Sequence, residues 1–407
     1  MQQQSALPFR FWILALIALI NSISFTSIIP LLYPYAKQFG LSDFQASLLT
    51  TAYAICQFIS TPILGRLSDV LGRKPLLVTS LSGTVVAGLL ASFTPVAWLL
   101  YAARMLDGLT GGNVSVARAV VSDMMSPAQR PKAFGIFDAM FRLGFVAGPT
   151  LSYLAQTLPP FPGVSSLGMG FLVSASMAFI AVVLTVFFLP ETLAERQEFR
   201  FSAQDFGIGK IIKSATRPTL GQLFLLTFFS GFSFTIFTFA FQPFFLNELG
   251  QNAEMLAIVF AMFGILGFVA QIFWLEPLIK RFSLMNILVI SLLVRGIIFL
   301  LIPTFPTFPI FLVLSIFFGI ANAYPLPLIN SLLSINSSNR EQGEIFGINA
   351  SYLSISNAFG PAIGGILVGL GYKAPFWITG VLTLLTTWFA FSLKPQLEDT
   401  PSSSAEP

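Results

Sequence analysis

Six ionisable side chains lie inside long apolar stretches of this sequence. They are Arg104, Asp107, Arg118, Asp138, Arg142 and Arg295. An ionisable group among apolar residues costs on the order of a few kcal/mol, so each is a functional candidate by default. Asp107 follows Arg104 by one helical turn, and burial and a neighbouring arginine act on the protonation of a carboxyl in opposite senses. We therefore predict that Asp107 loads and releases protons.

The remaining charges allow two interpretations. On antiparallel helices with a rise of about 1.5 Å per residue, Arg118 and Asp138 fall at similar depth and are expected to pair. A static pair that locks two helices together is the favoured interpretation for these two residues. In the alternative, Asp138 takes part in proton coupling. Arg104 and Arg142 either set the protonation of Asp107 or contact a substrate, unless all five charges of spans four and five form one static, neutralising network that locks these two helices together.

Composition indicates the elements that must position these side chains. The chain has 407 residues, of which 55% are hydrophobic and 9% are charged, and its mean hydropathy is +0.82. Because soluble domains carry roughly 25% charged residues, a soluble enzyme, a coiled coil and a disordered chain are excluded. The sequence contains no His and one cysteine, Cys56. A disulfide within the chain, a histidine metal site and a Ser-His-Asp triad are therefore excluded as well.

The predicted fold class is an all-α membrane protein with twelve transmembrane helices, because a membrane helix needs about 20 mostly apolar residues. The segments run near 10–33, 45–65, 75–93, 97–121, 133–157, 166–189, 219–243, 253–274, 284–303, 306–332, 343–370 and 375–393. The side of the membrane that holds both termini carries 15 Lys and Arg between or beside the spans, and the opposite side carries 2. The positive-inside rule places both termini in the cytoplasm, and we expect a bacterial inner (plasma) membrane.

An internal repeat divides the chain. The motif Phe134-Gly135-Ile136 with Gly148-Pro149 recurs in the second half as Phe346-Gly347-Ile348 with Gly360-Pro361, and both parts are displaced by the same offset, close to half the chain. The first copy opens span five and the second opens span eleven, so a duplicated six-span unit explains both. We expect a six-helix bundle over 1–190, a cytoplasmic linker over 191–218, a second bundle over 219–394 and a disordered tail over 395–407. The linker is either a solvated chain or partly an amphipathic helix on the inner leaflet, since apolar residues alternate with charges over 199–212.

The segment between spans two and three carries the most specific motif. From Gly65 to Pro75 it reads Gly-Arg-Leu-Ser-Asp-Val-Leu-Gly-Arg-Lys-Pro. Its two glycines permit a tight turn at the membrane face, and Arg73 and Lys74 are expected to anchor at the headgroups. The segment resembles the signature loop of the major facilitator superfamily, G-x-L-x-D-x-x-G-R-K.

The resemblance implies further roles. In the superfamily the acid and the arginine of this loop help to close the cytoplasmic side together with an acid after span four. This implies a gate formed by Gly65, Asp69, Gly72, Arg73 and Asp123. Gly148 with Pro149, and Gly360 with Pro361, resemble the helix-bending Gly-Pro motif of the exporting branch, and Arg104 matches an R-x-x-x-G element. The closest resemblance is to twelve-span drug:proton antiporters of the tetracycline-efflux type.

The same resemblance implies a central cavity between two six-helix bundles. The substrate-binding residues that it implies are Asn21, Tyr53, Gln57, Arg104, Asn113, Arg142, Gln242, Asn322, Asn349 and Tyr352. Most are neutral hydrogen-bonding groups, and span seven is rich in phenylalanine, which suits a hydrophobic or amphiphilic ligand.

The expected function is secondary active transport, in the form of proton-coupled export of a small hydrophobic or amphiphilic compound by alternating access. The alternatives are a uniporter or a proton symporter for uptake of a metabolite and, with less support, a non-transporting membrane sensor. No nucleotide-binding motif is present. We expect no enzymatic activity, no cofactor, no metal and no nucleic acid. The expected partners are the lipid bilayer, a small-molecule substrate and protons, and the expected state is a monomer.

Overall fold

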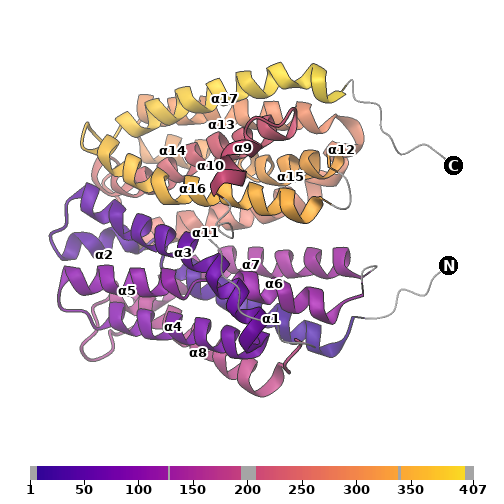
Figure 1. Cartoon of the computed structure of the whole chain (residues 1–407). Coiled ribbons are helices and arrows are strands. Elements are labelled where there is room, and N and C mark those ends of the chain that lie inside the picture. Colours follow the sequence, from indigo (N-terminus) through magenta and orange to yellow (C-terminus); the bar gives the residue numbers. More distant parts are fainter. Residues whose placement is uncertain (1–6, 127–128, 194–207, 338–340, 399–407) are drawn as a thin grey trace. The chain divides into compact units, whose positions relative to one another are not determined.

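The computed structural model describes residues 7–126, 129–193, 208–337 and 341–398 (Figure 1). Within these ranges the chain is helical and contains no strand. The helices of the first half are α1 (Phe9–Ser27), α2 (Leu32–Gln38), α3 (Asp43–Leu71), α4 (Arg73–Ser92), α5 (Ala97–Leu109), α6 (Asn113–Met124), α7 (Arg130–Thr157) and α8 (Gly168–Phe188). They are followed by α9 (Ile208–Ser214), α10 (Leu220–Pro243), η2 (Phe244–Glu248), α11 (Ala253–Val269), η3 (Ala270–Trp274), α12 (Leu275–Arg281), α13 (Leu284–Thr304), α14 (Phe308–Ala321), α15 (Pro325–Ile335), α16 (Gln342–Val368) and α17 (Ala374–Glu398).

Ten helical segments among the described residues are long and apolar enough to cross a membrane. They correspond to ten of the twelve expected spans. The other two are span four, which α5 and α6 share, and span five, which is the charged helix α7. Large apolar side chains such as Phe187, Leu370 and Trp388 face outward, as contact with lipid requires.

Spans four and ten are each broken into two helices, whereas the sequence suggested single helices over 97–121 and 306–332. In span four α5 ends at Leu109 and α6 begins at Asn113. In span ten α14 ends at Ala321 and α15 begins at Pro325. Local sequence explains both breaks, because Thr-Gly-Gly at 110–112 disfavours helix, and proline removes a backbone donor and is tolerated in the first turn of a new helix.

The helix bounds confirm the internal repeat. α6 begins at Asn113 and α15 at Pro325, while α7 begins at Arg130 and α16 at Gln342, so both pairs of helices share the offset of the repeated motif. Equivalent helices also make equivalent contacts, since α1 packs on α7 as α10 packs on α16.

The chain divides into two compact units by its internal contacts. One comprises Met1–Phe206 with Gln251–Gly264, and the other comprises Gly207–Gly250 with Ile265–Pro407. The first part of α11 therefore groups with the first unit, whereas the sequence placed it in the second half. Each unit has a core of its own. One is built around Phe11, Leu77 and Phe137, and the other around Phe224, Leu292 and Leu328.

Two boundaries differ from the sequence prediction. α17 extends to Glu398, so the expected disordered tail is helical over 395–398, and the remainder of it lies outside the described residues. In the linker, residues 194–207 also lie outside the described residues, and 208–214 form the short helix α9.

Candidate functional site

Arg104 and Asp107 form a buried ion pair inside the first unit. Both project from α5, and Arg104 Nη1 lies 2.8 Å from Asp107 Oδ2. Arg104 is 5% exposed and Asp107 is 7% exposed. The predicted proximity of the two residues on one helix face is confirmed. The pair sits in the last turns of α5, directly before the break in span four.

Side chains of α3 and α4 complete this site. The Tyr53 ring centroid lies 4.3 Å from the Arg104 guanidinium carbon, and the Tyr53 hydroxyl accepts a hydrogen bond of 2.9 Å from Gln57 Nε2. Thr84 of α4 is a further polar neighbour of Asp107. We call Tyr53, Gln57, Thr84, Arg104 and Asp107 the Asp107 cluster. All but Thr84 were candidates from sequence, and the fold of the first unit brings them together.

The charges of the Asp107 cluster balance only while Asp107 is ionised. A proton on Asp107 would remove the counter-charge of Arg104 and leave a buried cation. Within the described residues Arg104 Nε already has no hydrogen-bond partner. Because a buried charge without a partner is costly, protonation would favour either the approach of another group to Arg104 or a change in its surroundings.

Two further pairs join helices of the first unit. Asn113, the first residue of α6, donates from Nδ2 to Asn21 Oδ1 of α1 at 3.0 Å. Arg118 Nη2 lies 2.6 Å from Asp138 Oδ1, which confirms the predicted pairing. The side chains of Arg118 and Asp138 are 47% and 42% exposed, so this pair is far more accessible than Asp107. Arg142 is exposed, and its charge interacts with that of Asp138.

The candidates of the second unit have separate surroundings. Gln242 Nε2 lies 3.4 Å from its own helix at Thr238 O, and Asn349 Nδ2 donates to Asn330 Oδ1 at 2.9 Å. Asn322 Oδ1 accepts from Arg295 Nη1 at 3.2 Å. Among the described residues, the structure therefore gathers no counterpart of the Asp107 cluster from the predicted side chains of this unit.

Tyr352, a predicted substrate-binding residue, contacts the short helix α9 of the linker. Its hydroxyl lies 2.9 Å from Ile211 O and donates to it, and its ring stacks on Phe224 with the centroids 5.5 Å apart. Tyr352 thereby holds α9 against α16. This contact was not visible from sequence, because it joins residues 141 positions apart.

The signature segment folds differently from a loop. α3 continues through Ser68 and Asp69 to Leu71, and the turn falls on Gly72, whose φ is 114°. Glycine is required there, since other residues are strained at such a φ, and a Cβ would also overlap the Glu191 carboxylate. Gly65 lies inside the helix with nothing within 4 Å of a Cβ, so the prediction that Gly65 shapes a tight turn is wrong.

The predicted gate residues meet at Arg73. Its Nη1 lies 2.5 Å from Asp69 Oδ1, its Nε lies 2.9 Å from Asp123 Oδ2, and it also donates to Ser68 Oγ at 2.6 Å. Arg73 is 9% exposed. Its prediction as a headgroup anchor is therefore wrong, because two carboxylates hold the guanidinium inside the first unit.

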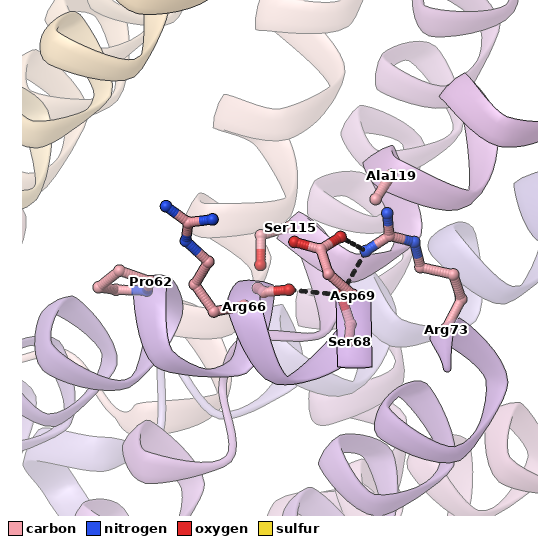
Figure 2. A pocket seen from close by; sticks show the side chains of 8 residues that line it. Pro62, Arg66, Ser68, Asp69, Arg73, Ser115 and Ala119 are labelled. Atoms are coloured by element: carbon pink, nitrogen blue, oxygen red, sulfur yellow. Dashed lines mark hydrogen bonds and ion pairs between the residues drawn. The ribbon is translucent and has the colours of Figure 1, made fainter. Parts of the chain in front are cut away.

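A cavity of about 400 Å³ lies beside this network, lined by Pro62, Gly65, Arg66, Ser68, Asp69, Arg73, Ser115 and Ala119. Figure 2 shows Asp69 turned toward Arg73, whereas Arg66 extends toward the opposite side of the cavity.

Glu191 is a member of this network that sequence reasoning did not assign. It follows α8 and reaches the first turn of α4. Burial opposes its charge, but four backbone N–H donors hold the pKa of its carboxyl below the usual range. These donors belong to Leu193, Arg73, Thr192 and Lys74. A carboxylate at a helix N-terminus satisfies donors that the helix leaves unpaired.

The two Gly-Pro motifs mark close helix contacts. Pro149 and Pro361 lie inside α7 and α16. A Cβ on Gly148 would overlap the Thr26 hydroxyl of α1, and a Cβ on Gly360 would overlap the Thr235 hydroxyl of α10. The glycines let each helix pair approach closely, and the bending role of the motifs stays a prediction.

Comparison with known proteins shows which family shares this architecture. The family model described as Major Facilitator Superfamily matches residues 14–220 and 223–407. Multidrug resistance protein 2 of Bacillus subtilis (strain 168) is 26% identical over 361 residues, which are 88% of this chain and 88% of that protein. The class B tetracycline resistance protein of Escherichia coli is 26% identical over 365 residues, which are 89% of this chain and 88% of that protein.

Solved structures share the fold. The human organic anion transporter MFSD10 (TETRAN) superposes with a TM-score of 0.71 at 21% identity, covering 94% of this chain and 100% of that one. A D-xylose-proton symporter superposes with a TM-score of 0.77 at 15% identity, covering 95% and 98%. The family model matches both halves of the chain, and this match is consistent with the twelve expected spans and with the network around Arg73. The chain is therefore a multi-pass membrane transporter that belongs to the major facilitator superfamily.

Proposed function

We propose that this transporter exports small hydrophobic or amphiphilic compounds in exchange for protons, and that Asp107 carries the proton. The observation that carries the proposal is the buried Arg104–Asp107 pair, with 2.8 Å between its charged atoms. Asp107 is a carboxylate that is 7% exposed and lies directly before a helix break. Relatives named for multidrug and tetracycline resistance, which align along nearly the whole chain, support export.

In the proposed cycle the proton and the substrate favour different states of the Asp107 cluster, so that binding of one opposes binding of the other. Protonation of Asp107 releases Arg104 from its counter-charge, and deprotonation restores the pair. Substrate binding is favoured in only one of these states, so proton entry drives substrate out by alternating access. The remaining substrate-binding candidates, including Gln242 and Asn349, would supply neutral hydrogen bonds.

Several further assignments belong to the same proposal. The two six-span halves, 1–190 and 219–394, act as the moving parts around one site. The transporter works as a monomer in a bacterial inner membrane with both termini in the cytoplasm. It moves its substrate without covalent change. The network of Asp69, Arg73 and Asp123 closes the cytoplasmic side.

The test uses purified protein in proteoliposomes with an imposed pH gradient and a panel of compounds that includes tetracycline and ethidium. We expect uphill movement of at least one compound opposite to protons. Asp107→Asn keeps the size of the side chain but cannot ionise, so it should abolish uphill movement and leave downhill exchange.

Asp138→Asn is the matched control, because it makes the same change in the accessible Arg118–Asp138 pair. We expect Asp138→Asn to retain gradient-driven movement. Uphill export by Asp107→Asn would overturn the role of Asp107, and uphill export by both variants would overturn proton coupling through either acid. Movement in the same direction as protons would indicate a symporter, and movement without any dependence on the gradient would indicate a uniporter.

A further inference from the structure

The breaks in spans four and ten are built from the same backbone hydrogen bonds. Thr110 N donates to Leu106 O, Gly111 N to Gly108 O and Val116 N to Gly112 O. The same three bonds recur at the repeat offset, from Asn322 N to Phe318 O, from Ala323 N to Ile320 O and from Leu328 N to Tyr324 O. The duplication has therefore preserved the geometry of the break, although the residues that form it have changed.

Each break presents a carbonyl oxygen to a glutamine from the second span of its own half. Gln57 Nε2 of α3 donates to Gly111 O at 3.2 Å. Gln271 Nε2 of η3 donates to Ala323 O at 2.7 Å. Gly111 and Ala323 are equivalent positions of the repeat. Gln271 lies within one helical turn of the position that is equivalent to Gln57 by the same offset. Two equivalent carbonyls are thus satisfied by the same kind of side chain from equivalent spans.

The sequence of span ten explains why Ala323 needs such a donor. In a continuous helix, Ala323 O would accept from the N–H of the residue four positions later. That residue is Pro327, which has no N–H. An unpaired carbonyl in a buried, apolar setting costs about 1–3 kcal/mol. The Gln271 side chain replaces the donor that Pro327 removes.

Gln271 reaches this carbonyl from an irregular turn. It lies in η3, a π-helical segment of five residues between α11 and α12. A π turn changes the direction of the side chains that follow it, and such turns occur frequently at functional sites. The irregular turn in span eight and the break in span ten are therefore joined by one hydrogen bond within the second unit.

Arg295 holds the same break through a second contact. Its Nη1 donates to Asn322 Oδ1 at 3.2 Å, and its Nη2 donates to Ser230 O and Oγ at 3.1 Å each. Arg295 is 2% exposed, and none of the ion pairs between described residues includes it. A cation beside the C-terminus of α14 is favourable for the helix dipole. Span four has a different arrangement, because the Arg104–Asp107 pair lies within the span itself.

We propose that Gln57 and Gln271 are a matched pair of positioning residues that fix the bend of spans four and ten. The bend sets where Asp107, just before one break, and Asn322, within the other, are held. Gln57 was a substrate-binding candidate, and here it acts through the backbone of span four. The proposal rests on the broken spans and not on proton coupling, so its outcome is independent of the export assay.

The test measures the bend directly with two spin labels. Val313 of α14 is 54% exposed and Ile335 of α15 is 70% exposed, so both accept a label in a Cys56→Ser background. Their separation along the chain corresponds to roughly 33 Å along a straight helix. Double electron–electron resonance on the full chain in lipid nanodiscs gives the distance distribution. Gln271→Met, which keeps the size but removes the donor, should broaden this distribution.

Three variants make the result specific. Gln57→Met should leave the distribution of span ten unchanged, because it acts in the other half. Ile272→Ala alters the same π segment at a side chain that is 50% exposed and should also have no effect. Adding Pro327→Ala to Gln271→Met restores a backbone donor to Ala323 O. The distance distribution should then narrow again, around a longer distance, because span ten becomes straighter.

Amide hydrogen exchange across residues 106–116 tests the matched partner. The exchange rate should rise about fivefold in Gln57→Met, because the loss of one hydrogen bond of average net strength changes an equilibrium by about that factor. It should not change in Gln271→Met.

An unchanged distance distribution in Gln271→Met overturns the proposal for span ten. Equal broadening by Gln57→Met or Ile272→Ala overturns it as well, since the effect would then be a general loss of stability.

Discussion

The contact between α1 and α7 at Gly148 allows a prediction whose magnitude follows from the structure. A Cβ at residue 148 would overlap the Thr26 hydroxyl and lie 2.9 Å from Ser27 N. Thr26 Oγ1 lies 2.7 Å from both Ser22 O and Gly144 O, so it cannot rotate away without losing the bond between the helices. Overpacking costs about 1–3 kcal/mol, and the lost hydrogen bond adds about 1 kcal/mol. Gly148→Ala should therefore destabilise the protein by about 2–4 kcal/mol.

Gly135→Ala is the matched control in the same helix. Nothing lies within 4 Å of a Cβ at residue 135, and alanine is favoured over glycine in a helix by up to about 1 kcal/mol. This variant should be neutral or stabilising. Combining Gly148→Ala with Thr26→Ala removes the severest overlap, the one with the hydroxyl, but leaves Thr26 Cβ and Ser27 N 2.9 Å from the new methyl group. The double variant should therefore recover part of the overpacking loss, which gives a coupling of roughly 0.5–3 kcal/mol.

The assay is equilibrium unfolding in mixed detergent micelles, with the free energy of unfolding compared among these variants, the single variant Thr26→Ala and the parent. The reasoning would be refuted if Gly148→Ala cost no more than Gly135→Ala. It would also be refuted if the double variant were no more stable than Gly148→Ala, since the contact with Thr26 would then not be the cause. The equivalent contact in the second half predicts a similar loss for Gly360→Ala.

Three further predictions concern the turn after α3 and the linker. Gly72→Ala should cost about 1–3 kcal/mol, because the backbone at Gly72 (φ 114°, ψ 152°) lies in a region that is essentially restricted to glycine, and more because the methyl group displaces Glu191. Gly65→Ala should not destabilise the protein, and thermal unfolding of both variants checks this. Glu191→Gln should destabilise the protein at pH 7 by about 1 kcal/mol, as for the loss of a helix cap. Because the native pKa of Glu191 lies below its ordinary value of 4.5, its charge stabilises the fold above that pH and ceases to do so as the pH falls through the native pKa. The difference between Glu191→Gln and the parent should therefore shrink on acidification, and a difference that grows would contradict the assignment. Tyr352→Phe removes the hydroxyl that holds Ile211 O but keeps the ring, so trypsin should cleave within α9 faster than in the parent, and an unchanged rate would exclude a tethering role.

The sequence by itself determined the features that depend on local order. Apolar segments of spanning length show where the chain must leave water, and helix periodicity places Arg104 beside Asp107 on one face of α5. The internal repeat was also readable, because duplicated helices keep their spacing. The approximate depths of Arg118 and Asp138 sufficed to pair them, since rise per residue is fixed in a helix.

The tertiary structure decided everything that joins distant segments. The burial of Arg73, the Glu191 carboxylate on the first turn of α4 and the Tyr352 contact with α9 connect residues that the sequence does not link. The roles of the glycines show the same limit: Gly65 and Gly72 look alike in the motif, but only Gly72 has a positive φ and a neighbour in the way of a Cβ. A proline predicts that a carbonyl will be unpaired, but which side chain satisfies that carbonyl depends on the packing of another helix. The helix predicted over 306–332 ran through Pro327 without a break, and Gln271 as the partner of Ala323 O emerges only from the packing.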